Sequence, residues 1–206
     1  MALTGVPKVA VLALQGDFEK HLDVLRRLGA EAVAARLPQE IDGADGLIIP
    51  GGESTTIGKL MARYGIDSAV LRAHSVGKPI YGTCAGLILL AKDIEEGTGE
   101  RGGQSTLGIL DIRVARNAYG RQVDSFEAEM NIPVLGEPDF RAVFIRAPKI
   151  TRIGSDVTTL GTYAGAPALV QQGTVFGSSF HPELSGDDRI HKIFLDAICK
   201  AMGCIG

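Results

Sequence analysis

The sequence predicts an α/β domain built on a mostly parallel sheet, with antiparallel strands added at one edge. Three observations support this fold class. Continuous apolar runs alternate with amphipathic helical patterns before about residue 92, which is typical of parallel strands buried on both faces. Short strand-like runs then follow one another closely, which is typical of antiparallel neighbours. The length of 206 residues suits one domain with a full core, so we expect residues 1–206 to form a single domain.

The first half is expected to supply the parallel part of the sheet. Residues 9–14 are a continuous apolar run, and residues 18–28 then carry apolar side chains at helical spacing until Gly29 ends the pattern. The remaining elements expected here are strands at 31–36, 46–49 and 79–81 and helices at 57–64 and 67–76. This alternation predicts helices on both faces of the sheet.

The second half is expected to add antiparallel strands and a closing helix. Glycine is frequent at 97–103, and this stretch matches the letters of a dinucleotide-binding loop. A dinucleotide-binding loop follows a strand and opens a helix, whereas this stretch follows a predicted helix and no helix is predicted after it. We therefore interpret it as a connecting loop. The expected strands lie at 107–114, 126–130, 142–145, 158–163, 168–172 and 175–180, and the last helix has Ile190, Ile193, Phe194, Ala197 and Ile198 on its inner face.

Composition and charge argue against several function classes. The net charge is −3 and no basic run is present, so neither nucleic acid nor an anionic membrane is expected as a partner. Cys84, Cys199 and Cys204 form neither a disulfide framework nor paired zinc-ligand spacing, so no metal is expected. No motif indicates a cofactor. The start lacks a signal-peptide pattern and no apolar run is long enough to span a membrane, so we expect a cytoplasmic protein.

The residues Gly82-Thr83-Cys84-Ala85-Gly86 predict a nucleophile at a sharp turn. They lie between a short strand and the apolar run 87–91, which indicates a strand, a tight turn and a helix with Cys84 at the apex. The glycines let the strand and helix approach closely, and a helix N-terminus favours the thiolate form that attacks carbonyl groups. Cysteine is also a common small core residue, so this motif alone leaves packing and catalysis about equally open.

A general base for Cys84 is expected in the segment Phe180-His181-Pro182-Glu183. Residues two apart on an extended segment share a face, and Pro182 disfavours a helical conformation at His181, so the Glu183 carboxylate can orient the imidazole. A lone His-x-Glu is usually a surface pair. Together with Cys84 it supplies a nucleophile, a base and an orienting group. Both segments follow predicted strands, at the edge where open α/β sheets place their sites.

A third segment, Pro50-Gly51-Gly52-Glu53-Ser54, also follows a buried strand. Its paired glycines allow backbone amides to turn toward a ligand. A phosphate-binding loop is excluded because Gly58-Lys59 lacks the leading glycine of that motif. We interpret the segment as one side of an oxyanion hole, in which the amides of Gly52 and Ala85 donate to one oxygen. A plain turn that caps a helix is the alternative.

Together these motifs resemble the class I, or triad, glutamine amidotransferases. The similarity is closest to the family of glutaminase subunits of pyridoxal 5′-phosphate synthases, and it spans nearly the whole chain. The segments that carry it are Leu12-Ala13-Leu14-Gln15-Gly16, the 50–56 loop, the 82–87 turn, Arg116-Asn117, Gly120-Arg121-Gln122-Val123-Asp124-Ser125-Phe126, 144–148 and 180–184. The resemblance implies a three-layer, flavodoxin-like fold and a glutaminase that hydrolyses L-glutamine to L-glutamate and ammonia.

The resemblance also implies roles for individual residues. Cys84, His181 and Glu183 would form the catalytic triad, with the Cys84 thiolate attacking the glutamine carboxamide. The glutamine pocket would be lined by Gly52, Glu53, Ser54, Arg116, Ile145 and Arg146. An arginine suits the substrate carboxylate because a guanidinium donates paired hydrogen bonds, although either arginine taken alone is more typical of a surface ion pair.

The implied partner is a TIM-barrel synthase subunit that receives the ammonia and builds the vitamin B6 coenzyme from a pentose phosphate and a triose phosphate. Weak activity alone and activation on docking are expected, because ammonia released without its acceptor is lost. We expect the Gly51-Gly52 peptide to be the movable part, since glycine can reorient where other residues cannot.

Three other functions remain as alternatives. A glutaminase of another pathway, such as histidine or purine synthesis, is disfavoured by the segment 116–126. A catalytically silent regulatory subunit is expected to lack a member of the triad, whereas all three residue types are present. A cysteine protease or esterase needs a broad or apolar cleft, whereas this chain offers arginines and a tight glycine loop.

Overall fold

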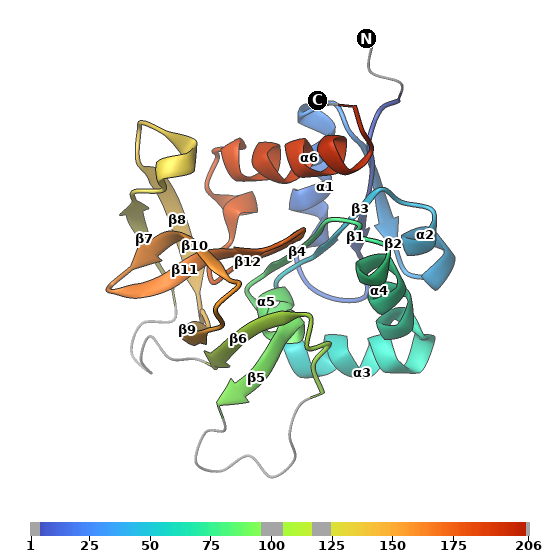
Figure 1. The fold of residues 1–206 in the computed structure, drawn as a ribbon, viewed down its shortest axis with the longest axis horizontal. Helices are drawn as coiled ribbons and strands as arrows, with labels where there is room; N and C mark the ends of the chain where they lie inside the picture. The colour runs from blue at the N-terminus through green and yellow to red at the C-terminus, as the bar shows by residue number, and fades with distance from the viewer. Residues whose placement is uncertain (1–4, 96–104, 117–124, 205–206) are drawn as a thin grey trace.

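The central feature of the fold is a seven-stranded sheet between two layers of helices (Figure 1). The computed structural model describes residues 5–95, 105–116 and 125–204. The strand order is β10-β11-β12-β4-β3-β1-β2. In chain order these strands are β1 Lys8–Leu12, β2 Glu31–Ala35, β3 Gly46–Ile49, β4 Ile80–Thr83, β10 Thr158–Tyr163, β11 Ala166–Gln172 and β12 Val175–Ser178.

Five neighbouring strands of this sheet are parallel. β2, β1, β3, β4 and β12 pair in that order, which is the 2-1-3-4-5 order of flavodoxin-like sheets. β11 and β10 then continue the sheet in antiparallel pairing beyond β12. The predicted fold class, a mostly parallel sheet with antiparallel strands added at one edge, is confirmed.

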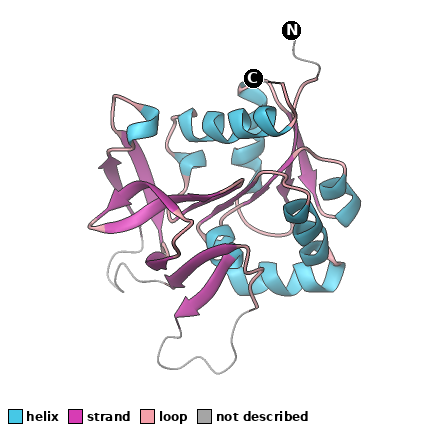
Figure 2. Ribbon diagram, in the orientation of Figure 1, coloured by secondary structure: helices cyan, strands magenta, loops and turns pink. Residues whose placement is uncertain are grey.

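Alternate residues of the central strands face two separate cores, as the period of two along a strand requires. Val9 and Val11 of β1 pack toward α1 and α6, whereas Ala10 and Leu12 pack toward the other helices. One layer contains α1 Phe18–Arg27 and α6 Arg189–Ala201, and the other contains α2 Pro38–Asp42, α3 Ser54–Tyr64, α4 Ile66–Ser75 and α5 Ala85–Leu90 (Figure 2). In the described part of the chain, no helix has the length and apolar character that a membrane-spanning segment needs.

The second half departs from the expected pattern in two smaller sheets. β5 Ala91–Glu95, β6 Leu110–Ala115 and β9 Lys149–Ile153 form one of them, and β7 Ser125–Met130 pairs with β8 Phe140–Ile145 in the other. The predicted antiparallel strands at one edge of the main sheet are therefore β10 and β11, whereas the other strands of the second half that lie outside the main sheet form sheets of their own. The close spacing correctly indicates the antiparallel pairs β7–β8, β10–β11 and β11–β12, but it carries no information on which sheet each pair belongs to.

Two strands, one short α-helix and the single 3₁₀ turns at Pro133–Leu135 and Pro182–Leu184 are not predicted by the sequence pattern. β5 and β9 each bury only one residue fully, so their alternation is weak, and α2 has five residues, too few to show a helical period. Residues 91–95 form the strand β5. The prediction that the glycine-rich stretch at 97–103 follows a helix is therefore wrong. The stretch itself lies outside the described residues.

Candidate active site

Cys84 lies at a strained turn between β4 and α5, as the motif predicts. Its φ of 50° and ψ of −101° are rare for a residue with a side chain, and its N–H donates to Ser178 O at 2.9 Å. Glycine is needed on both sides of the turn. A Cβ on Gly86 would lie 2.0 Å from Ile49 O, and a Cβ on Gly82 would lie 2.6 Å from the Gly86 carbonyl carbon. The close packing of β4, α5 and β3 thus holds the turn in its strained conformation.

His181 and Glu183 meet at the end of β12, but not along an extended segment as predicted. His181 N–H donates to Val143 O at 2.8 Å, and Pro182 then begins a single 3₁₀ turn over Pro182–Leu184. Proline at the first position of such a turn has the required φ already fixed. The turn folds the Glu183 side chain back, so that His181 Nδ1 lies 2.7 Å from Glu183 Oε1.

The electrostatics of this pair favour a charged imidazole. Burial alone would lower the pKa of His181, but hydrogen bonds to the Cys84 and Glu183 side chains raise it to about 10. Burial alone would raise the pKa of Glu183, but the neighbouring His21 and the hydrogen bond from His181 lower it to about 2. At neutral pH the imidazole is therefore protonated beside a carboxylate, and it can act as the acid in a proton transfer.

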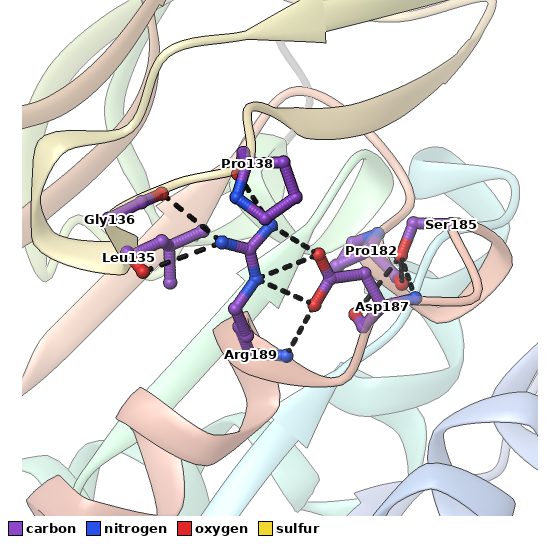
Figure 3. A network of polar contacts seen from close by, with 7 residues as sticks. All are labelled: Leu135, Gly136, Pro138, Pro182, Ser185, Asp187 and Arg189. Atoms are coloured by element: carbon purple, nitrogen blue, oxygen red, sulfur yellow. Dashed lines mark hydrogen bonds and ion pairs between the residues drawn. The ribbon is translucent and has the colours of Figure 1, made fainter.

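A polar network behind the 3₁₀ turn fixes its position (Figure 3). Ser185 Oγ donates to Pro182 O at 2.7 Å, and the Asp187 N–H donates to Ser185 Oγ at 3.0 Å. Arg189 Nη2 lies 2.6 Å from Asp187 Oδ2. The Arg189 guanidinium also donates to three carbonyl oxygens of the connection between β7 and β8, those of Leu135, Gly136 and Pro138. The network joins the turn that carries Glu183 to α6 and to the β7–β8 hairpin.

The Gly51-Gly52 turn packs tightly between the end of β1 and the imidazole. A Cβ on Gly16 would lie 1.9 Å from Gly51 O, and a Cβ on Gly51 would lie 2.3 Å from His181 Cε1. Gly52 has a φ of 152°, in the region that favours glycine. Gln15 Oε1 accepts a hydrogen bond from the next N–H along the loop, that of residue 53, at 2.8 Å. Backbone contacts therefore set the shape of this loop, and a side chain at these glycines would disrupt it.

Glu53 immediately precedes α3 and caps its N-terminus. Its carboxylate accepts hydrogen bonds from Thr55 N at 3.0 Å and Thr56 N at 2.6 Å. Burial raises the pKa of Glu53, but these hydrogen bonds lower it to about 2. Arg116 Nη2 lies 3.8 Å from Glu53 Oε1. The segment is therefore both a helix start and part of the candidate site, so the two readings of its sequence are compatible.

A cavity of about 280 Å³ opens over the sulfur, at the small end of ligand pockets in proteins. Its wall contains Asp17, Gly51, Gly52, Glu53, Ser54, Cys84, Ala85, Ile88, Arg116, Ile145, Arg146, His181 and Leu184. Every residue predicted for the site lies on this wall except Glu183, which is placed behind the imidazole. The two amides expected in the oxyanion hole, those of Gly52 and Ala85, belong to residues of the same wall.

The charged side chains of the cavity have both signs. Arg116 follows β6, and Arg146 follows β8 with a φ of 43° that turns the chain there. The carboxylates of Asp17 and Glu53 lie on the same wall. The carbonyl oxygen of Ile145, the last residue of β8, lies 3.7 Å from Cys84 Sγ and accepts its hydrogen bond. A small ligand with both an anionic and a cationic group matches this lining.

The sequence reasoning missed two buried histidines, His21 beside Glu183 and His191 beside His21. His21 lies on α1, and its Nε2 is 3.3 Å from Glu183 Oε2. His191 lies on α6, and its Nε2 is 2.9 Å from the Nδ1 of His21. The signal that could have found His21 is its spacing, three residues after Phe18 and four before Leu25 on the apolar face of α1. Among the described residues, no group of three or more histidine, cysteine or acidic side chains has metal-binding geometry.

Comparisons with known proteins agree on one family. A model of the SNO glutamine amidotransferase family matches residues 11–200. The pyridoxal 5′-phosphate synthase subunit PdxT of Pelotomaculum thermopropionicum is 49% identical over 194 residues, covering 94% of this chain and 96% of the relative. The protein of the same name from Herpetosiphon aurantiacus is 51% identical over 188 residues, covering 91% and 98%.

Solved structures have the same fold. A crystal structure described as a glutamine amidotransferase superposes with a TM-score of 0.86 at 49% identity, covering 94% of this chain and 99% of that one. A chain in the structure of PurLQS from Thermotoga maritima superposes with a TM-score of 0.68 at 20% identity, covering 96% and 100%. The second likeness is evidence of the fold alone.

Proposed function

Because this chain belongs to the SNO glutamine amidotransferase family, we propose that it is the glutaminase subunit of a pyridoxal 5′-phosphate synthase. It hydrolyses L-glutamine to L-glutamate and ammonia, and the ammonia serves the synthesis of the vitamin B6 coenzyme. One observation carries the proposal: Cys84 and His181 lie on the wall of one charged cavity, and His181 Nδ1 is hydrogen-bonded to Glu183 Oε1 at 2.7 Å behind that wall.

In the proposed reaction the Cys84 sulfur attacks the carboxamide carbon of glutamine. The amides of Gly52 and Ala85 stabilise the negative oxygen that forms, an effect of roughly 10²- to 10³-fold in rate for one donor. His181 gives a proton to the departing nitrogen, so ammonia leaves and a glutamyl thioester remains. His181 then takes a proton from a water molecule, which attacks the thioester and releases glutamate. Glu183 holds the imidazole in place and stabilises its charged form.

The same cavity is proposed to bind the rest of the glutamine molecule. The residues assigned to this role are Gly52, Glu53, Ser54, Arg116, Ile145 and Arg146. A guanidinium of Arg116 or Arg146 suits the substrate α-carboxylate through paired hydrogen bonds. The mixed charge of the lining supports an amino acid as the ligand, and it disfavours the neutral esters that an esterase takes.

The ammonia is proposed to pass to a separate synthase subunit with a TIM-barrel fold, in a hetero-oligomer of the cytoplasm. Residues 1–206 act in it as one glutamine amidotransferase domain. The Gly51-Gly52 peptide is the part that partner binding moves, so that its amide turns toward the oxyanion. The φ of Gly52 and the contact of Gly51 with the imidazole support this assignment, since a small rotation there changes what faces the sulfur.

The test is a glutamate-release assay with and without the synthase subunit. We expect slow release from the chain alone and faster release from the complex. Coenzyme synthesis from glutamine should need both subunits, whereas synthesis from ammonium salts should need the synthase subunit alone. Equal rates of glutamate release with and without the partner would contradict activation by the partner. No glutamate release in either case would overturn the proposed function.

A further inference from the structure

The two carboxylate oxygens of Glu183 have different surroundings. Oε1 lies 2.7 Å from His181 Nδ1, in the hydrogen bond described above. Oε2 makes no hydrogen bond to any residue that the structure describes, but His21 Nε2 lies 3.3 Å from it. The side chains of His21 and Glu183 are both fully buried, so solvent does not screen this contact.

His21 is in turn bonded to a third histidine. The distance of 2.9 Å between His21 Nδ1 and His191 Nε2 joins α1 to α6. The ring of Tyr81 meets His191 edge to face, and Thr83 Oγ1 lies 3.4 Å from His21 Nε2. Three of the four histidines of the chain therefore form one line with Glu183, which runs from the cavity wall to the layer of α1 and α6.

Both of the deeper histidines are neutral at neutral pH. Burial lowers the pKa of His21, and the nearby Glu183 carboxylate does not reverse this effect. Burial and the neighbouring His21 ring lower the pKa of His191 to about 3. The more distant charges that act on the pair are His181, Asp17 and Arg27, and all have smaller effects. Each of the two rings therefore has one N–H and one lone pair.

One arrangement of these two protons fits the contacts. With the proton of His21 on Nε2, the positive end of that N–H lies beside both the negative Glu183 Oε2 and Thr83 Oγ1, and the Nδ1 lone pair accepts from His191 Nε2–H. The reverse arrangement would place a His21 lone pair against the carboxylate. It would also leave a buried His191 Nδ1–H with no acceptor among the described residues. The contacts therefore favour Nε2–H on both rings.

We propose that His21 is a positioning residue: its Nε2–H holds Glu183 Oε2 so that Oε1 stays aligned with His181 Nδ1, and His191 fixes the proton on His21. This inference rests on the proposed function of the Cys84 site and deepens it. His21 is not part of the cavity wall, so it acts through Glu183 and touches no substrate. If the Nε2–H of His21 is removed, no donor among the described residues faces Glu183 Oε2. The carboxylate can then rotate, and the imidazole of His181 is no longer held in position beside the Cys84 sulfur.

The matched pair His21→Gln and His21→Asn tests this role, because both place a carboxamide in the same buried space. The amide nitrogen of a glutamine side chain takes the position of Nε2, which faces Glu183. The amide nitrogen of an asparagine side chain takes the position of Nδ1, which faces His191. We expect kcat of His21→Gln within about threefold of the natural chain, and kcat of His21→Asn about 10- to 100-fold lower, as for a misplaced catalytic group.

Glutamate release is measured for the chain together with its synthase subunit. KM for glutamine should change by less than about threefold in both variants, because the cavity wall is intact. His74→Gln, on α4 in the other helix layer, is the control and should match the natural chain. Equal kcat values for His21→Gln and His21→Asn would overturn the positioning role. A natural chain that releases no glutamate would instead defeat the proposed function, and this inference with it.

A second measurement needs neither a variant nor an active enzyme. Nitrogen-15 NMR of the histidine rings distinguishes a protonated ring nitrogen from a bare one. At neutral pH, we expect His21 and His191 both to be neutral with the proton on Nε2. A proton on His21 Nδ1, or a doubly protonated His21 ring, would contradict the proposed arrangement even if the variants behave as expected.

Discussion

The turn around Cys84 and the histidines behind Glu183 differ in how the sequence encodes them. The turn is made by neighbours along the chain, since Gly82 and Gly86 flank Cys84 and provide the space that it needs. His21 and His191 are 170 positions apart, and they meet because α1 and α6 cover the same face of the sheet. The comparison teaches that a nucleophile can be recognised from a local motif, whereas the buried groups that support its base become visible only in the fold.

Removing the sulfur tests the local side of this comparison and should have the largest effect. Cys84→Ala should lower kcat for glutamine hydrolysis at least about 10⁴-fold, because Cys84 supplies the one thiol among the described residues of the cavity wall. The free energy of unfolding should change by only about 1 kcal/mol, since the variant loses one small atom from a turn that the glycines shape. Steady-state glutamate release and urea denaturation measure the two quantities. Activity within tenfold of the natural chain would reject Cys84 as the nucleophile.

Glu183→Gln tests the residue that connects the catalytic imidazole of His181 to the buried histidines His21 and His191. The carboxamide keeps the shape of the side chain but not its charge, so it no longer stabilises the protonated His181. We expect kcat to fall about 10²- to 10³-fold, less than for Cys84→Ala, because an orienting group contributes less than the nucleophile. Rates for the two variants are compared in one assay. A larger loss for Glu183→Gln than for Cys84→Ala would contradict the assigned order of roles.

Gly86→Ala tests whether the turn depends on backbone packing. The new Cβ would lie 2.0 Å from Ile49 O, so β3 and α5 must move apart. The free energy of unfolding should fall by about 3 kcal/mol, as for overpacked cores. Gly5→Ala is the matched control, because a Cβ there meets nothing within 4 Å. Urea denaturation should separate the two variants, and equal stabilities would show that the turn tolerates a side chain.

Mild acid tests the buried histidines and should have the smallest effect. The pKa of His191 is about 3 in the folded chain and about 6.5 when exposed, so the unfolded chain binds the extra proton first as the pH falls. Between pH 6.5 and pH 5 this difference alone should lower the free energy of unfolding by about 1.5 kcal/mol. His181 acts in the opposite direction, because its folded form is already protonated while its exposed form gains a proton over this range, so it offsets part of the loss; Glu183 stays ionised in the folded chain. Comparison with a variant that lacks only the His191 ring cancels both contributions.

The matched variant for this prediction is His191→Gln. Its unfolding free energy should depend less on pH over the same interval, by about the same 1.5 kcal/mol, because the titrating ring is gone. His74→Gln should retain the pH dependence of the natural chain. An identical pH dependence in His191→Gln and the natural chain would mean that His191 does not remain neutral when buried.

The sequence predicts most of the parallel sheet because its strands are buried on both faces. β3, β4 and β12 bury every residue, so each begins with or contains adjacent apolar residues where an alternating strand would have a polar one. β5 and β9 lie in a small sheet with much of their surface exposed, so their residues follow no clear alternation. The β7–β8 and β10–β11 hairpins have similar sequence patterns but belong to different sheets. The sheet that each one joins depends on contacts with residues that are distant in the sequence.

The candidate site is predicted in part for a related reason. Cys84, Gly52 and His181 each follow a strand, and the carboxyl ends of neighbouring parallel strands must lie close together. The contact between His181 and Glu183 depends on a 3₁₀ turn that the extended reading did not include. His21 could not be predicted as a neighbour of Glu183, because its helical spacing indicates burial but does not name the buried partner.

The most direct test of the central claim is covalent labelling of the chain with an electrophilic analogue of glutamine, followed by peptide mass analysis. The chain has three free cysteines, so Cys199 and Cys204 are internal controls. We predict one label on Cys84, formed more slowly when glutamine is present and unaffected by simple esters. A label on Cys199 or Cys204 instead, or a rate that glutamine does not change, would contradict the assignment of this cavity as the site of glutamine hydrolysis.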